Sequence, residues 1–151
     1  MITKILVPTD GSERAEDAAG FAIELAKGFG ATVLFINVVD DVSPAFAYEL
    51  ERGVILDLCE IAAQRRKCAH NAVDRLKEKA EAAGVTAETV VADGHPSDGI
   101  LQTAIKEGAD HIVIGSHGRR ALAAAVLGNV TVNVIHGAKV PVTVIPVREE
   151  A

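Results

Sequence analysis

The chain has 151 residues and a formal net charge of -6, with 49% hydrophobic and 24% charged residues. This length favours one domain over residues 1–151, and the composition excludes a largely disordered chain. The negative charge argues against a general nucleic-acid binder, because no global basic field exists to displace counterions. No apolar run is long enough for a bilayer and no signal sequence precedes the first strand, so we expect a cytoplasmic protein.

Short apolar strands alternate with helical patterns along the whole chain. The expected strands are residues 4–8, 31–39, 86–92, 111–114 and 140–147. The expected helices run from the cap Ser12 to Phe29, over about 54–83, from a cap at Ser97, and over 130–136. This alternation predicts an α/β fold with a doubly wound, Rossmann-like parallel sheet of five strands, for which we expect the order 3-2-1-4-5.

The spacing of apolar residues also predicts which faces are buried. Stripes at three- and four-residue steps place Phe29 and Ile105 on inward faces, and we expect Cys68 to be a core thiol. Cys59 and Cys68 fall on opposite faces of one helix, which excludes both a disulfide and a shared metal. Prolines near both ends of the last strand place it at a sheet edge, with one apolar side open to a partner.

Glycines follow the buried strand 111–114 and precede a helix, in Gly115-Ser-His-Gly118 and Gly128-Asn-Val-Thr131. In this position, glycines allow the backbone and a helix N-terminus to approach an anion, although such a set is a weak signal alone. His117 has no recognisable nucleophile with a supporting acid, so we assign no catalytic residue. The P-loop lysine is also missing, and efficient phosphoryl transfer is therefore not implied.

Three features together resemble the universal stress protein family. They are the opening Ile5-Leu-Val-Pro-Thr-Asp10-Gly-Ser12, the Gly94-His-Pro96 turn, and glycines 115, 118 and 128 at the family's G-x2-G-x9-G spacing. The Val140-Pro-Val-Thr-Val144 strand follows them in the family's order. The resemblance covers nearly the whole chain and implies a nucleotide-binding stress protein that forms a homodimer through its fifth strand.

The resemblance also implies where ATP or AMP would bind, with Mg²⁺ entering only through the phosphates and no protein metal site. Adenosine would lie against Pro8, Thr9, Asp10 and the backbone of Val38. Ribose and phosphates would lie against Gly115, Gly118, Arg119, Gly128, Asn129, Val130 and Thr131. These positions agree with ligand binding beyond the carboxyl ends of parallel strands.

One position departs from the family pattern. Asn129 stands where ATP-binding members usually carry Ser or Thr, which weakens the expectation of triphosphate binding. An amide can still donate to phosphate, and we expect the Thr131 hydroxyl to be available as well. Asp10 could instead only cap its own turn, and Arg119 could be a solvated charge. Two alternative functions therefore stay open: an interaction module without nucleotide, and a slow ATPase suggested by fold analogy alone.

Overall fold

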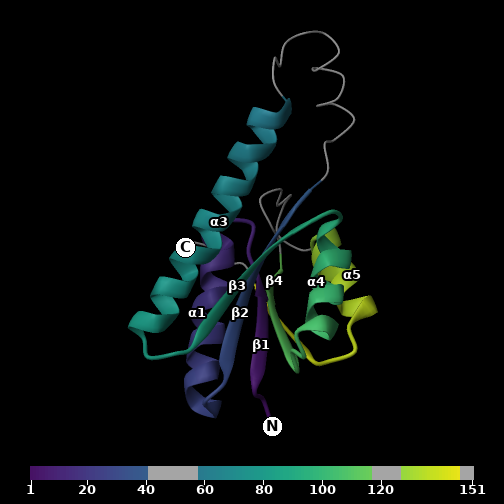
Figure 1. Ribbon diagram of the computed structural model, residues 1–151. Helices are drawn as coiled ribbons and strands as arrows, with labels where there is room; N and C mark the ends of the chain where they lie inside the picture. Colours follow the sequence, from purple (N-terminus) through teal and green to yellow (C-terminus); the bar gives the residue numbers. More distant parts are fainter. Residues whose placement is uncertain (41–57, 117–126, 147–151) are drawn as a thin grey trace, which may run out of the picture.

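The computed structural model describes residues 1–40, 58–116 and 127–146. Its elements follow the expected alternation (Figure 1): β1 Lys4–Pro8, α1 Glu13–Phe29, β2 Thr32–Val39, α3 Leu58–Ala82, β3 Ala87–Asp93, α4 Pro96–Lys106, β4 His111–Gly115, α5 Asn129–Gly137 and β5 Val142–Ile145. Each observed element overlaps the range that the sequence predicts for it. Residues 54–57 of the expected long helix and position 147 of the expected last strand lie outside the described residues.

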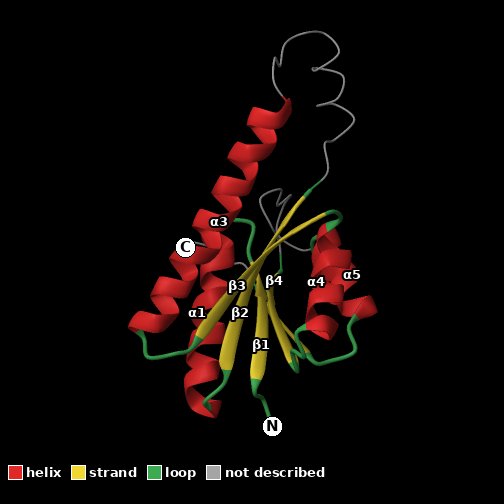
Figure 2. Ribbon diagram, viewed as in Figure 1, coloured by secondary structure: helices red, strands yellow, loops and turns green. Residues whose placement is uncertain are grey.

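The five strands form one parallel sheet in the order β3-β2-β1-β4-β5, which confirms the expected topology. Helices α1 and α3 cover one face of the sheet, and α4 and α5 cover the other (Figure 2). The chain therefore reverses its direction of winding between β1 and β4, which are neighbours in the sheet. A switch point of this kind leaves a crevice at the carboxyl ends of the two strands.

Alternation along the strands divides the apolar side chains between two cores. Ile5, Val7 and Phe35 belong to the cluster under α1 and α3, whereas Leu6 and Ile36 belong to the cluster under α4 and α5. Successive strand side chains point to opposite faces, so a sheet covered on both faces needs apolar residues at every position. This requirement explains the continuous apolar runs in the sequence.

Local signals fix the ends of α1. The Ser12 hydroxyl accepts a hydrogen bond from the Ala15 amide at 3.3 Å, and two acidic residues, Glu13 and Glu16, lie in the first turn. Both features satisfy or complement the unpaired amides of a helix start. Gly30 ends the helix at a φ of 67°, a left-handed conformation that residues other than glycine rarely adopt.

The structure corrects three expectations about buried side chains. Cys68 is exposed, because it lies outside the stripe of α3 that contains Ala69, Val73 and Leu76. Ile105 is 70% exposed, since it falls outside the buried face of α4. Phe29 keeps the angle of the buried stripe of α1 but is the last helical residue, and it remains 50% exposed.

The structure confirms that β5 lies at a sheet edge. Its apolar side, which was expected to be open to a partner, packs partly against the core of the same chain. Val142 and Val144 pack against the α4–α5 cluster and are half-buried. The carbonyls of Pro141 and Ile145 accept from amides that belong to β4 or directly follow it. Because backbone groups alternate in direction along a strand, the N–H and C=O groups of Val142 and Val144 point away from β4. Among the described residues no further strand pairs with this edge.

Candidate functional site

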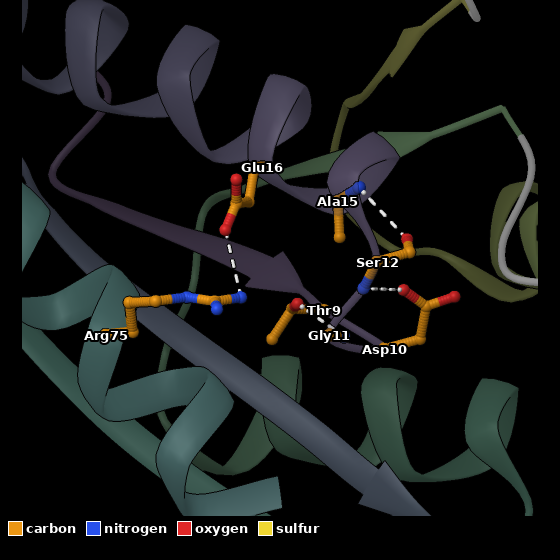
Figure 3. A network of polar contacts seen from close by, with 7 residues as sticks. All are labelled: Thr9, Asp10, Gly11, Ser12, Ala15, Glu16 and Arg75. Carbon is orange, nitrogen blue, oxygen red and sulfur yellow. Dashed lines mark hydrogen bonds and ion pairs between the residues drawn. The ribbon is translucent and has the colours of Figure 1, made fainter. Parts of the chain in front are cut away.

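The segment that follows β1 is held rigidly at the carboxyl end of the sheet. The Thr9 amide donates to the Ile36 carbonyl of β2 at 2.8 Å, and the Thr9 hydroxyl accepts from the Gly11 amide at 3.1 Å. One Asp10 carboxylate oxygen accepts from the Ser12 amide at 2.9 Å. Figure 3 shows the other oxygen directed away from that bond. Gly11 permits the tight turn with a φ of 83°.

The ends of β2 and β3 are joined by backbone contacts. The Gly94 amide donates to the Val39 carbonyl at 3.0 Å. Gly99 of α4 lies so close to Val38 that a Cβ at this position would be 2.8 Å from Val38 Cγ2. The first turns of α4 are thereby held against the last residues of β2. Val38, whose backbone the family resemblance places against adenosine, lies beneath α4.

Two arginines of α3 also reach this edge of the sheet. Arg66 forms an ion pair with Asp93 at the end of β3, and an Arg65 guanidinium nitrogen lies 3.4 Å from the Asp40 carbonyl. Both contacts are exposed, so the ion pair contributes at most about 1 kcal/mol to folding. They nevertheless bring positive charge to the ends of β2 and β3.

The end of β4 is joined to the start of α5. The Ser116 amide donates to the Ile145 carbonyl, and the Gly128 amide donates to the Ser116 carbonyl, each at 2.8 Å. The Thr131 hydroxyl donates to the Gly115 carbonyl at 2.8 Å. Gly128 is the N-cap of α5 and offers no side chain to the first-turn amides. A helix start without a capping side chain and without acidic residues is suited to receive an anion.

Polar burial concentrates at this end of the molecule. In the described part of the chain, four polar side chains are more than nine-tenths buried: Thr9, Ser97, Ser116 and Thr131. Each follows the carboxyl end of a strand, or lies in the first turn of the helix that does so. Burying hydroxyl groups is costly unless they are hydrogen-bonded, and three of the four have described partners: Thr9 with Gly11, Ser97 with His95 and Thr131 with Gly115. These bonds hold the turns and helix starts at the carboxyl end of the sheet.

The opposite end of the sheet holds a different polar cluster that serves the fold. The Asp110 carboxylate accepts hydrogen bonds from the Thr3 amide, the Thr3 hydroxyl and the Lys4 amide. Burial raises the pKa of Asp110, but these hydrogen bonds and the amino terminus outweigh it, and the pKa lies below the ordinary value. Burial lowers the pKa of the neighbouring His111 despite the Asp110 charge.

A cavity of about 170 Å³ lies near the start of β4, at the end of the sheet opposite to the buried hydroxyl groups. Leu101, Ile105, Ile112 and Val140 line it, and Lys139 is its charged member. Such a lining lacks the convergent polar groups that orient a nucleotide. The chemistry of the chain therefore points to the carboxyl end of the sheet and away from this cavity.

Comparison with known proteins decides the family. A model of the universal stress protein family matches residues 1–146. Universal stress protein MJ0531 of Methanocaldococcus jannaschii is 38% identical over 142 residues, covering 94% of this chain and 81% of that protein. The chain belongs to the universal stress protein family.

Solved structures agree with this assignment. The structure of MJ0577, another universal stress protein of Methanocaldococcus jannaschii, has a TM-score of 0.83 and 31% identity and covers 99% of both chains. A universal stress protein in complex with cAMP is 22% identical, with a TM-score of 0.68 and coverage of 97% and 98%. A family protein from Arabidopsis thaliana with AMP bound is 18% identical, with a TM-score of 0.68 and coverage of 97% and 92%. At these two identities the likeness shows the shared fold.

The structure gathers most of the residues that the sequence assigns to the site of this universal stress protein. Residues of four ranges lie at the carboxyl ends of β1, β2 and β4 and at the start of α5: Pro8–Asp10, Val38, Gly115 and Gly128–Thr131. Gly118 and Arg119 lie outside the described residues. Asn129 is exposed at the first position of α5.

Two expectations from the sequence, one about a site residue and one about a helix cap, need correction. The Thr131 hydroxyl, expected to be available to a phosphate, donates instead to the Gly115 carbonyl. Ser97 is not a helix cap, because α4 begins at Pro96 with His95 as its N-cap. The Ser97 hydroxyl lies 2.9 Å from His95 Nδ1. This contact was not predicted from the sequence.

The described residues contain no group of three or more His, Cys, Asp or Glu side chains that could hold a metal ion. Within the same part of the chain, no helix combines the length and the apolar character needed to cross a membrane.

Proposed function

We propose that this universal stress protein binds adenine nucleotide, ATP or AMP, at the carboxyl ends of β1, β2 and β4, and acts as a cytoplasmic, homodimeric stress sensor or regulator. One observation carries the proposal. The uncapped start of α5 lies at the switch point of the sheet, where β1 and β4 are neighbours and Asp10 follows β1. Amides that can donate to an anion and a carboxylate that can accept from hydroxyl or amino groups thus lie at the carboxyl ends of neighbouring strands.

Asp10 and the start of α5 suit different parts of a nucleotide. Asp10 is aimed by its bond to the Ser12 amide, and a carboxylate so fixed can accept from ribose hydroxyls or the adenine amino group. The α5 start favours phosphate by about 0.3–1 kcal/mol through its dipole, before any direct hydrogen bond. The reported binding of cAMP and AMP by two proteins of the same fold supports an adenine ligand.

Calorimetric titration with ATP–Mg²⁺ and then with AMP tests this proposal. Asp10→Asn keeps an oxygen for the Ser12 amide but removes the charge, so we expect about 10- to 100-fold weaker binding of both nucleotides. Asp74→Asn, an exposed charge-matched change on α3, is the control and leaves affinity unchanged. Absence of heat and of any thermal shift with either nucleotide would refute the proposal and favour the interaction module.

Asn129 tests which nucleotide fits. Asn129→Ser restores the residue type that ATP-binding members of the family usually carry and leaves Asp10 untouched. We expect this change to raise the affinity for ATP more than that for AMP, because the side chain is exposed at the start of α5, where outer phosphates would lie. An equal effect on both ligands would place this residue elsewhere than at the phosphates.

Product formation from ATP, measured over hours, tests the slow ATPase alternative.

The outer edge of β5 supports the homodimer. The outward N–H and C=O groups of β5 can hydrogen-bond to those of a second copy. Such pairing covers an exposed strand edge, which otherwise favours aggregation. Val144→Pro deletes an outward N–H without removing a bond to β4, and Val144→Ala controls for the lost side-chain packing. Sedimentation should show a dimer for the unchanged protein and for the Ala variant, and a monomer for the Pro variant. A dimer that survives Val144→Pro would place the interface elsewhere.

A further inference from the structure

His95 is an exposed histidine whose ring is fixed by a buried partner. The Ser97 hydroxyl lies 2.9 Å from His95 Nδ1, and Ser97 is only 3% exposed. A buried hydroxyl needs a hydrogen-bond partner, and here a partner is the ring nitrogen of an exposed side chain. The Ser97 contact leaves Nε2 as the ring nitrogen without a described partner.

The position of His95 follows from three contacts around the end of β2. Gly94, the preceding residue, donates its amide to the Val39 carbonyl at 3.0 Å. Gly99, four residues further on, has no room for a Cβ because of Val38. The His95 carbonyl accepts from the Gly99 amide at 3.0 Å, which holds the two residues in one helical turn. His95 is therefore anchored beside the strand end that is assigned to adenosine.

From this arrangement we propose that His95, held by Ser97, is a further ligand-binding residue whose Nε2 hydrogen-bonds the adenosine part of the nucleotide. The inference rests on the proposed function. Ser97 belongs to the same set of buried polar side chains as Thr9, Ser116 and Thr131, all at the carboxyl end of the sheet. In this account Ser97 is a positioning residue, because it acts on the ligand only through His95.

Both acidic and basic side chains lie on the elements around His95. Asp98 lies on the same helix, Asp93 ends β3, and Asp40 follows β2. Arg66 pairs with Asp93, and Arg65 contacts the Asp40 backbone, so the two arginines only partly offset the acids. The imidazole Nε2 donates or accepts according to the ring tautomer, which suits the ring nitrogens and the amino group of adenine and the ribose hydroxyls.

The test compares the unchanged protein with His95→Ala, His95→Gln and Ser97→Ala in calorimetric titrations with AMP and ATP. We expect His95→Ala to weaken both nucleotides by the same factor, about 3- to 10-fold, because adenosine is common to them. His95→Gln should retain most of the affinity, because its side-chain amide can still hydrogen-bond the ligand.

Ser97→Ala separates positioning from contact. This variant should lose less affinity than His95→Ala, and the double variant should bind as His95→Ala does. His136→Ala, an exposed histidine in the last turn of α5, is the matched control and should bind as the unchanged protein does. Each variant is first checked for an unchanged melting temperature.

The outcomes distinguish this inference from the function beneath it. If the unchanged protein binds nucleotide and His95→Ala binds it equally well, the inference alone is wrong. The same holds if His95→Gln binds nucleotide no better than His95→Ala does. If the unchanged protein binds no nucleotide, both the proposed function and this inference are wrong.

Discussion

Gly99→Ala tests how closely α4 is packed on the sheet beside the proposed site. The added Cβ would lie 2.8 Å from Val38 Cγ2 and 3.0 Å from Val38 Cγ1. Carbon atoms at rest are about 3.5 Å apart or more, so the shorter contact is about 0.7 Å too close. Valine is β-branched and cannot swing its methyl groups aside freely, so α4 or β2 must move.

The magnitude follows from two opposing terms. Overpacking of this kind costs about 1–3 kcal/mol, whereas replacing a helical glycine by alanine gains about 1 kcal/mol. Gly20 in α1 has no atom within 4 Å of its added Cβ, so Gly20→Ala keeps only the gain. We therefore expect Gly99→Ala to be less stable than Gly20→Ala by about 1–3 kcal/mol, or about 2–12 °C in melting temperature.

The assay is urea unfolding of both variants at one protein concentration, with equal m values required for the comparison. Val38→Ala in the Gly99→Ala background should remove the clash, so the two changes together should cost less than the sum of their separate effects. Two results would refute the reasoning: Gly99→Ala as stable as Gly20→Ala, or strict additivity with Val38→Ala. Either would mean that α4 is not pressed against β2.

Three further changes test other contacts. Thr131→Val keeps the side-chain shape but leaves the Gly115 carbonyl without this donor, so we expect a loss of about 1–3 kcal/mol by urea unfolding; no loss would make the bond dispensable. Ser12→Ala removes the N-cap of α1 and should cost about 1 kcal/mol in the same measurement, and an unchanged midpoint would contradict the capping role. The pKa of Asp110 is lower in the folded chain than in the unfolded chain, so its stabilisation is full above the ordinary value of 3.8 and is lost as pH falls below it. Asp110→Asn should therefore flatten the acid limb of a stability-against-pH curve, and an equally steep limb would show that the bonds to Thr3 do not favour the charged form.

The positions in the fold of those candidate-site residues that follow a strand were predictable from the sequence. Pro8 to Asp10 comes directly after an apolar run, and Gly115 comes directly after another. Because all strands of a doubly wound sheet point the same way, residues that follow strands must share one edge. The sequence therefore places these residues correctly without any knowledge of their contacts.

The contacts that complete the site were not predictable in the same way. Arg66 and Asp93 are 27 residues apart in the sequence. They meet only because α3 packs across the sheet, which places Arg66 beside the end of β3. The hydrogen bond from Thr131 to Gly115 depends on how α5 approaches β4. Neither meeting leaves a periodic or local signal in the chain.

The sequence by itself determined the alternation of strands and helices, the two-sided burial of the sheet and the family, because these depend on local periodicity and on motif spacing. Only the tertiary structure decided that Cys68 and Ile105 are exposed, since that depends on which arc of a helix meets the sheet. Only the tertiary structure brought the first turn of α4 against Val38 and thereby placed His95 beside the site. The physical reason is that side-chain neighbours across elements are set by packing in three dimensions, which a one-dimensional pattern does not encode.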